Sequence, residues 1–338
     1  MLKKILATLL TAAMLLSFAA CSKTEEEPAA PESAPAEQEA EAEKPAEEKA
    51  DAENEKKEAY TFTDDLGRTV TVSSIEKVAV LLGSHADVWA QAGGTVFAAV
   101  DDAWEDFKLP MPEGGVNLGG TKSLSLELLL GCEPDFILAS TNSAQHMEWQ
   151  SALEGSGIPT AYFDVTTFDD YLRMLNICTD ITGRKDLYEE KGLAVQKEIE
   201  EIMKANEGKP SQNVLMMRAS AASIRAKGST KNVLGEMLLN FGCKNIADND
   251  KTLLENLSAE AILLQNPDKI FFIQTGDDLE GINKNIETLF KENPLLMELD
   301  AVKNKEVYLM DKHLYNLKPN ARWAEAYAKL AEILYAEA

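Results

Sequence analysis

The sequence predicts an α/β protein made of two Rossmann-like lobes, each with a mostly parallel sheet, joined by one long α-helix. In both halves of the chain, short apolar runs alternate with amphipathic segments, which is the pattern of parallel strands connected by helices. Between the halves, residues 168–207 show only helical periodicity. One thirteen-residue pattern also occurs once in each half, 133 positions apart, which indicates two similar lobes.

The first lobe, residues 59–167, is expected to alternate strands with helices. Its predicted strands are 77–82, 96–100, 135–140 and 160–164, and its predicted helices are 85–92, 124–131 and 144–156. The strands are apolar, and glycine or proline follows each helix closely, as expected where helices end. This alternation favours parallel strands with right-handed crossovers.

The interdomain segment, residues 168–207, is interrupted only at Gly183 and Arg184. Its second part, 185–205, has the periodicity of a long, partly exposed helix. The second lobe, residues 208–338, resumes the alternation of strands and helices. Its predicted strands are 213–219, 268–275 and 306–311, and its predicted helices are 232–242 and 322–336.

The repeated pattern is S-x-E-x-x-L-x-x-x-P-D-x-I, found at Ser125–Ile137 and at Ser258–Ile270. In each copy the serine is expected to be the N-cap of a helix, and the glutamate, Glu127 or Glu260, takes the second helical position. The leucine should face the core, and Pro-Asp should end the helix and begin a strand. The helix dipole stabilises a first-turn glutamate by about 0.3–1 kcal/mol, so the pattern alone is compatible with a structural role.

The first 58 residues are predicted to lie outside the fold. Residues 1–20 have the positive start, short apolar run and small-residue end of a secretory signal peptide, and the apolar run is too short to span a membrane. Cys21 follows directly and resembles the lipid-anchored cysteine of bacterial lipoproteins, with an ordinary cleaved signal as the alternative. The linker that completes residues 21–58 is acidic and lacks large apolar residues, so it is expected to be disordered.

The remaining body of the protein is also acidic. Residues 22–58 contain 14 acidic and 5 basic residues, so Ala59–Ala338 carries −17 of the net charge of −24 once Lys3 and Lys4 are counted. Nucleic-acid binding needs a basic surface, and we therefore expect no nucleic-acid partner. A local binding site can still carry a net charge opposite in sign to that of the whole protein.

Residues that bind metals are few and scattered. The cysteines of the body form no C-x-x-C pair and are interpreted as small buried residues, with a disulfide between two of them as an alternative in an exported protein. They are Cys132, Cys178 and Cys243. The three histidines lack ligand spacing, and they are His85, His146 and His313. We therefore expect no metal site and no cofactor.

Several features together resemble one family. They are the segment YTFTDDLGRTVTV at 60–72, the paired S-x-E…P-D elements, the mid-chain helix and the ending LKPNARWAEAYAKLAEILY at 317–335. Their order is similar to that of the substrate-binding proteins of ABC importers for iron siderophores, haem and vitamin B12, over essentially all of residues 59–338. The resemblance implies a non-enzymatic, extracytoplasmic protein, lipid-anchored to the cell membrane, that captures a small metal chelate between its lobes.

The resemblance also implies a partner. In that family, one surface glutamate on each lobe docks into an arginine-lined pocket on each of two permease subunits. Glu127 and Glu260 match these positions, so we expect docking to a permease dimer that works with its ATPase. A two-fold permease presents the same basic site twice, which would account for the repeat. We expect the binding protein itself to be a monomer.

Candidate ligand contacts come from the expected geometry. Ligands of open α/β sheets bind beyond the carboxyl ends of the strands, and ligands of two-lobed binders lie between the lobes. The candidates are Ser84, His85, Trp104, Asn142, Arg218, Tyr315, Lys318 and Arg322. For His85, a structural role at a helix start is preferred over axial ligation of a metal, and Trp323 is expected in the core. Arg225 and Lys227 are compatible with either the rim of the site or plain solvent exposure.

The sequence leaves the ligand open. A ferric siderophore comes first because Arg218, Lys318 and Arg322 offer positive charge, cobalamin second because aromatic side chains can clamp its ring, and haem third. An exported enzyme is disfavoured, since no G-x-S-x-G, P-loop or G-x-G-x-x-G motif occurs. A surface adhesion lipoprotein is the remaining alternative, and it would bind no small molecule.

Overall fold

The computed structural model describes residues 59–255 and 257–335, and every structural statement below concerns these residues. The predicted signal peptide (1–20), the predicted lipid-anchor Cys21 and the linker up to residue 58 lie outside the described residues. Within the described ranges, no helix combines the length and the apolar character needed to cross a bilayer.

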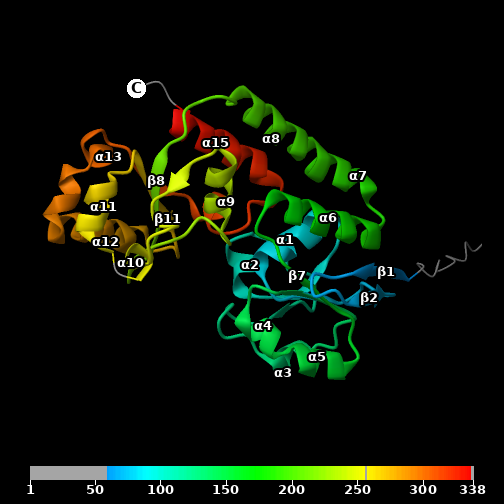
Figure 1. The fold of residues 1–338 in the computed structure, drawn as a ribbon. Helices are drawn as coiled ribbons and strands as arrows, with labels where there is room; N and C mark the ends of the chain where they lie inside the picture. Colours follow the sequence, from blue (N-terminus) through cyan, green and yellow to red (C-terminus); the bar gives the residue numbers. More distant parts are fainter. Residues whose placement is uncertain (1–58, 256, 336–338) are drawn as a thin grey trace, which may run out of the picture. The chain divides into compact units, whose positions relative to one another are not determined.

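The first lobe contains a five-stranded parallel sheet with the order β5-β4-β3-β6-β7 (Figure 1). Its strands are β3 (Val78–Val80), β4 (Val96–Ala99), β5 (Val116–Asn117), β6 (Phe136–Ser140) and β7 (Thr160–Phe163). Its helices are α1 (Gly83–Gln91), α2 (Asp101–Glu105), α3 (Leu126–Gly131), α4 (Ala144–Glu148) and α5 (Gln150–Ser156). An antiparallel pair, β1 (Tyr60–Thr63) and β2 (Thr69–Val72), precedes the sheet.

Several elements of this lobe differ from the sequence prediction, among them helix α2 and the strands β1 and β2, which were not predicted. The helix expected at 144–156 is divided at Trp149, whose ψ of −7° departs from regular helical geometry. Strand β5 is only two residues long, which is too short for the alternation of apolar residues to reveal it.

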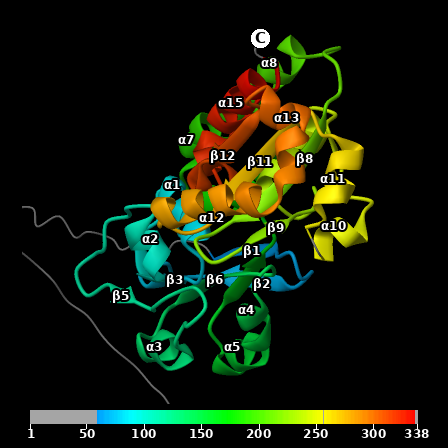
Figure 2. The same cartoon turned by 90° about the vertical axis from the view of Figure 1, so that its left-hand side faces the viewer.

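The second sheet has the parallel order β10-β8-β11-β12, with β9 added antiparallel to β8. Its strands are β8 (Asn213–Ala219), β9 (Ile224–Ala226), β10 (Lys244–Asn245), β11 (Lys269–Gln274) and β12 (Val307–Met310). The α-helices of this lobe are α9 (Val233–Asn240), α10 (Lys251–Glu255), α11 (Ala259–Gln265), α12 (Leu279–Glu292), α13 (Asp300–Lys303), α14 (Lys312–Tyr315) and α15 (Trp323–Tyr335), and two 3-10 turns are η2 (Pro294–Glu298) and η3 (Asn320–Arg322). Figure 2 shows α11, α12 and α13 on one face of this sheet, with α15 on the other.

The two lobes are connected by helices, as predicted. Helix α6 (Phe168–Thr182) ends at Gly183, which adopts a left-handed φ of 77°. The chain then runs through α7 (Lys185–Tyr188), a π-helical turn η1 (Glu189–Leu193) and α8 (Ala194–Ala205) without a break between these elements. Figure 1 shows α8 lying beside α15, against which it packs. The fold is therefore two-lobed α/β, as the sequence predicted.

Among the described residues, the largest of three hydrophobic clusters extends through both lobes, while the other two each lie within one lobe. The largest cluster includes Phe136 from the first sheet, Leu175 from α6, Ile199 from α8 and Phe271 from the second sheet. Trp323 in α15 is fully buried in this core, as the sequence predicted. Because one core contains parts of both sheets, the lobes are packed together rather than merely connected.

The repeated pattern has the expected local structure in both copies. The hydroxyl of Ser125 accepts a hydrogen bond from the backbone N–H of Leu128, and the hydroxyl of Ser258 accepts one from Ala261. Each serine is thus an N-cap, which confirms that prediction. The fully buried residues of the two helices are Leu129 and Ile262, whereas the repeated leucine that follows each of them is only partly buried.

The repeated Pro-Asp also has a structural role. A carboxylate oxygen of Asp135 accepts hydrogen bonds from the backbone N–H groups of Glu76 and Lys77, next to the first residue of β3. In the other copy, Asp268 accepts one from the backbone N–H of Asn213, at the start of β8. Each aspartate therefore ties its own strand to the central strand of its sheet.

Candidate functional site

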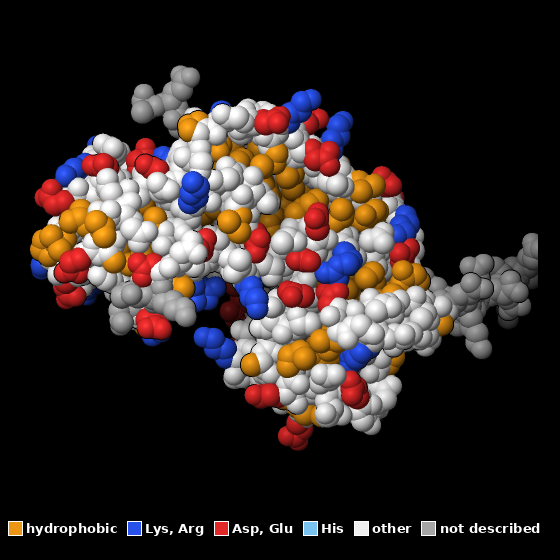
Figure 3. All heavy atoms as spheres, viewed as in Figure 1, with side chains coloured by type: hydrophobic (Ala, Val, Ile, Leu, Met, Phe, Trp, Pro, Cys, Tyr) orange, Lys and Arg blue, Asp and Glu red, His pale blue; other side chains and the backbone are white. Residues whose placement is uncertain are grey.

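Polar side chains of both lobes collect where the parallel strands end. Asn142 and Asp164 follow β6 and β7 in the first lobe, while Arg218 lies near the end of β8 and Lys318 follows β12 and α14 in the second. Figure 3 shows the surface hollowed between the two halves of the body, with Lys and Arg side chains gathered around the hollow. We call this region the cleft.

Four cations in the second lobe form what we call the cationic cluster, which is Arg218, Arg225, Lys227 and Lys318. Arg218 and Arg225 are direct cross-strand partners in the β8–β9 pair. Like charges directly opposite one another in a sheet are destabilising. Within the described residues, none of the four makes an ion pair, although most other cations near the cleft, such as Lys312 and Arg322, do.

The pKa shifts reflect this crowding of positive charge. Burial lowers the pKa of Lys318 to about 8, and Arg218 acts in the same direction, whereas Asp164 and Asp170 oppose the shift. Burial, followed by repulsion from Arg218 and Arg225, also lowers the pKa of Lys227. The cluster is thus short of negative charge, and a bound anion would supply it.

Two neutral histidines lie beneath the first-lobe side of the cleft. His85, in the first turn of α1, is 1% exposed. Burial lowers its pKa to about 3, with Lys318 and His146 adding to the shift. His146 accepts a hydrogen bond from the backbone N–H of Ser140 through Nδ1, and burial lowers its pKa to about 4. The preferred structural interpretation of His85 agrees with this position.

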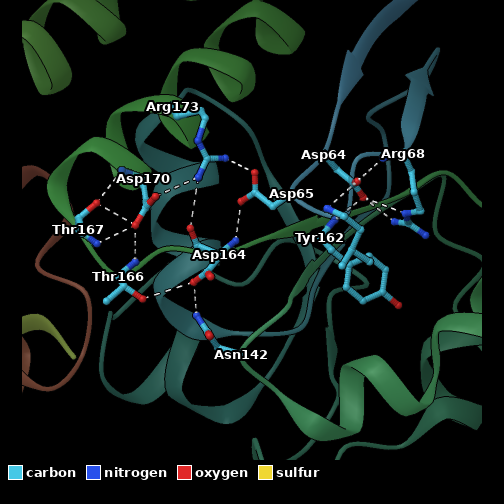
Figure 4. A network of polar contacts seen from close by, with 11 residues as sticks. Asp64, Asp65, Arg68, Asn142, Tyr162, Asp164, Thr166, Thr167, Asp170 and Arg173 are labelled. Carbon is cyan, nitrogen blue, oxygen red and sulfur yellow. Dashed lines mark hydrogen bonds and ion pairs between the residues drawn. The ribbon is translucent and has the colours of Figure 1, made fainter. Parts of the chain in front are cut away.

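The first-lobe wall of the cleft is a polar network, shown in Figure 4. Asn142 donates to the carboxylate of Asp164 at 2.5 Å, and the backbone N–H of Asp164 donates to Asp65 at 2.6 Å. Arg173 pairs with Asp65 and, at 3.1 Å, with Asp170. Asn142 remains exposed at the edge of this network, so its amide is placed at the cleft although one donor is already used.

Two sets of contacts join the lobes beside the cleft. Lys312, from α14, pairs with Asp106 of the first lobe at 2.6 Å and also with Asp277 of its own lobe. Asn320, from η3, donates through Nδ2 to the carbonyl of Ser84 at 2.9 Å and to Asp87 at 2.7 Å. Sequence reasoning did not find the Lys312 bridge, because its partners are far apart in the chain.

Besides His85, three further candidate contacts are buried or partly buried, and a fourth is exposed but already paired. Tyr315 is 3% exposed, and its hydroxyl donates to the carbonyl of Ala326 in the core. Ser84 is 4% exposed and offers its carbonyl to Asn320. Trp104 is partly buried against the core, with its indole N–H directed to the carbonyl of Ala99.

Arg322 is the fourth of these candidates. It is exposed, but its guanidinium forms a two-pronged pair with Glu325 at 2.7 and 3.1 Å. Its charge is therefore already compensated. Arg225 and Lys227, left ambiguous by the sequence, lie on or next to β9 beside Arg218. Ile224 and Ala226 alternate with these two cations as in a strand, but the run is too short for the alternation to predict β9.

Comparison with known proteins places the chain in a family. The model of the family described as periplasmic binding protein matches residues 78–314, which is more than half of the chain. The chain belongs to the periplasmic binding protein family. Periplasmic binding proteins of this kind are extracytoplasmic substrate-binding proteins of ABC importers, which work with a permease and an ATPase. This one is accordingly a substrate-binding protein and not an enzyme.

Two curated relatives of this periplasmic binding protein come from Bacillus subtilis. The Fe(3+)-citrate-binding protein YfmC is 23% identical over 279 residues, covering 82% of this chain and 86% of the relative. The iron-uptake system-binding protein is 23% identical over 331 residues, covering 97% of this chain and 96% of the relative. The matches extend over nearly the full length of both relatives.

Solved structures share the fold of this periplasmic binding protein. Staphylococcus aureus SirA complexed with staphyloferrin B superimposes with a TM-score of 0.60 and 21% identity, covering 82% of this chain and 97% of SirA. S. aureus IsdE complexed with heme has a TM-score of 0.63 and 16% identity, covering 77% of this chain and 98% of IsdE. At these identities the likeness shows the two-lobed fold and leaves the ligand to the side chains of the cleft.

We predict that the free energy of unfolding falls as the pH is lowered from about 6.5 towards 4, through the buried histidines. Their folded-state pKa values, about 3 for His85 and about 4 for His146, lie below that of a histidine in the unfolded chain. The unfolded state therefore binds protons first, so stability that is fully present above pH 6.5 is lost as the pH falls.

Urea unfolding at a series of pH values measures this slope. His85→Gln should reduce it by up to about 1.4 kcal/mol per pH unit, the contribution of one proton. An identical slope for wild type and His85→Gln would show that His85 is not held neutral in the folded protein.

Proposed function

We propose that this periplasmic binding protein captures an anionic ferric chelate in the cleft and delivers it to an ABC permease. The observation that carries the proposal is the cationic cluster, four positive side chains that make no ion pair with any described residue, in a body of net charge −17. A protein with that many carboxylates has ample means to neutralise a structural cation. Unpaired, mutually repelling cations beside a cleft are therefore expected to have an anionic ligand.

The iron-related names of the relatives support a ferric chelate. One relative is named for Fe(3+)-citrate, and SirA was solved with staphyloferrin B. Citrate is a carboxylate ligand, and guanidinium and ammonium groups hold carboxylates through charge-assisted hydrogen bonds. The metal would arrive inside its chelator, held by the chelator's own ligand atoms.

Haem and cobalamin receive less support from the side chains near the cleft. Haem binding through His85 or a tyrosine is disfavoured, since His85 and Tyr315 are both buried. Cobalamin needs aromatic side chains that face the cleft, and the indole of Trp104 packs against the core instead. An anionic ferric siderophore or citrate complex therefore remains the leading ligand.

The ligand proposal predicts that Lys318→Met weakens binding of ferric citrate by about tenfold to hundredfold, the loss of one charge-assisted hydrogen bond. The affinity of the wild type should also fall as salt is added, because salt screens the cluster. Fluorescence titration with ferric citrate measures both effects. Lys303→Met is the matched control, since Lys303 is paired with Glu298 and lies outside the cleft. Equal affinities for Lys318→Met and wild type would contradict the proposal.

We further propose that Glu127 and Glu260 dock the protein to the permease. Both are exposed, and neither has a cationic partner within the described residues. Glu260 accepts only a hydrogen bond from the hydroxyl of its own N-cap, Ser258, at 3.1 Å. The serine, proline and aspartate of the repeat have clear structural tasks, which leaves the glutamate free to act on a partner.

The docking proposal predicts that Glu127→Ala combined with Glu260→Ala abolishes chelate uptake by cells while ligand affinity stays unchanged. Uptake of radioactive ferric chelate and titration of the purified variant measure the two quantities. Glu280→Ala is the control, because Glu280 is also an exposed first-turn glutamate, in α12, but lies outside the repeat. Normal uptake by the double variant would rule out the docking role.

We also propose that the mature protein is anchored through lipid on Cys21, as supported by the signal-like residues before it and the acidic spacer after it. Cys21→Ser should then prevent incorporation of a labelled fatty acid and release the protein from the membrane fraction. Fatty-acid labelling that is equal in both proteins would argue against anchoring at this residue.

A further inference from the structure

A short segment of the second lobe passes over the first turns of α1. It follows α14, contains Asn316, Lys318 and Asn320, and leads into α15. We call this segment, residues 316–320, the strap. Its far end is attached to the first lobe, because Nδ2 of Asn320 donates to the carbonyl of Ser84 at 2.9 Å and to the carboxylate of Asp87 at 2.7 Å.

The backbone of Asn320 makes this attachment specific. Asn320 is fully buried and has a left-handed φ of 52°, a conformation that few residues other than glycine and asparagine adopt readily. Asparagine therefore supplies both the backbone turn and the two hydrogen bonds. Pro319 precedes it with φ of −67°, which limits the freedom of the strap on the side of Lys318.

A chain of partly buried hydrogen bonds holds Asp87, the partner of Asn320, in place. Gln91 donates to the same oxygen of Asp87 at 2.6 Å, and the hydroxyl of Tyr171 lies 3.1 Å from the amide oxygen of Gln91. The Tyr171 hydroxyl is also 3.0 Å from the carbonyl of Lys191, in the π-helical turn of the interdomain helix. The attachment point of the strap is thus connected to α1, to α6 and to the interdomain helix.

The strap in turn holds two members of the cationic cluster. Lys318 is part of it, and the guanidinium of Arg218 donates to the side-chain oxygen of Asn316 at 3.1 Å. Within the described residues, the ammonium of Lys318 has no hydrogen bond and no ion pair. Its position is therefore set by the backbone of the strap and not by a partner of its own.

We propose that Asn320 is a positioning residue for ligand binding: by attaching the strap to α1, it fixes the Lys318 ammonium relative to the Arg218 guanidinium, the two groups that hold the anionic chelate. The effect on ligand affinity rests on the proposed function, whereas the hydrogen bonds that attach Asn320 to α1 are present without a ligand. The buried amide of Asn320 thus influences affinity through the position of Lys318, and this gives a function to the contact between the strap and the first lobe.

The first test compares ferric-citrate affinity in Asn320→Gly with that in wild type. Glycine keeps the left-handed backbone and removes only the amide, and we expect binding to weaken about tenfold. In a Lys318→Met background the same change should have less than a twofold effect, since the ammonium that Asn320 positions against Arg218 is then absent. Equal losses in both backgrounds would show that Asn320 acts on stability alone and would overturn the inference.

The matched control is Asn266→Gly. Asn266, the C-cap of α11, is also a left-handed asparagine, with φ of 39°. Its side-chain amide also makes two hydrogen bonds, donating to the carboxylate of Asp300 and accepting from the backbone N–H of Asp300 at the start of α13. It lies outside the strap, so its replacement should lower the thermal stability of the protein and leave affinity unchanged. Weaker binding in both variants by the same factor would contradict a specific role for Asn320.

A second readout needs no ligand. Acetic anhydride acylates neutral amines, so the pH dependence of Lys318 acylation, followed by peptide mass spectrometry, reports its pKa. His85, Asp164, Asp170 and Arg218 surround this amine. With the strap attached we expect half-maximal acylation near pH 8, and Asn320→Gly should raise that value by one unit or more as the amine gains water.

The two readouts separate the two proposals. If wild type fails to bind ferric citrate but Asn320→Gly raises the Lys318 pKa, the proposed ligand is wrong and the positioning role stands. If wild type binds ferric citrate and Asn320→Gly changes neither affinity nor acylation, the proposed function stands and the positioning role is overturned.

Discussion

The contact between α1 and the chain that follows β12 is the constraint on which the cleft depends. Ser84 and Asp87 belong to the helix that begins where β3 ends, while Asn320 belongs to the chain beyond the end of β12. Joining these two points brings the carboxyl ends of two separate parallel sheets to the same place. Ligands of α/β sheets bind at such strand ends, so this contact turns two ordinary sheets into one binding site.

The charges of the site follow from that arrangement. The first lobe contributes an acidic, hydrogen-bonded wall around Asp164 and Asp170 (Figure 4). The second lobe contributes the cationic cluster. Lys318 lies within the influence of both, and the lowered pKa of its amine shows that burial and Arg218 outweigh the carboxylates. A ligand with negative charge relieves this imbalance, whereas a neutral ligand leaves Arg218 opposite Arg225 with nothing between them.

Much of the fold could be predicted because its signals are local. Apolar runs such as Asn213–Ala219 identify buried strands, and the Ser N-caps and Pro-Asp ends of the repeat identify helix boundaries. Strand β9 was missed because three residues carry too little periodic signal. The role of Asp135 was also missed, since its partners at Glu76 and Lys77 become neighbours only when β3 and β6 pair.

The site was less predictable for a physical reason. Position after a strand places a residue near the cleft, but it does not say which way the side chain points. Lys318 and Tyr315 both follow β12. The Lys318 amine makes no hydrogen bond to any described residue, whereas the Tyr315 hydroxyl donates to the carbonyl of Ala326 in the core. The sequence predicted Arg322 as a ligand contact, but its guanidinium forms an ion pair with Glu325. Such outcomes depend on tertiary neighbours that no local pattern contains.

The most direct test of the account is a titration of residues 59–338 with a panel of ligands, in which tryptophan fluorescence is the measured signal. The panel comprises ferric citrate, ferric catecholates, ferric hydroxamates, cobalamin and haemin. The account predicts saturable quenching by the anionic ferric chelates, weakened by salt, with little response to cobalamin or to uncharged hydroxamate complexes. Tight, salt-independent binding of cobalamin or haemin, or no response to any member of the panel, would contradict it.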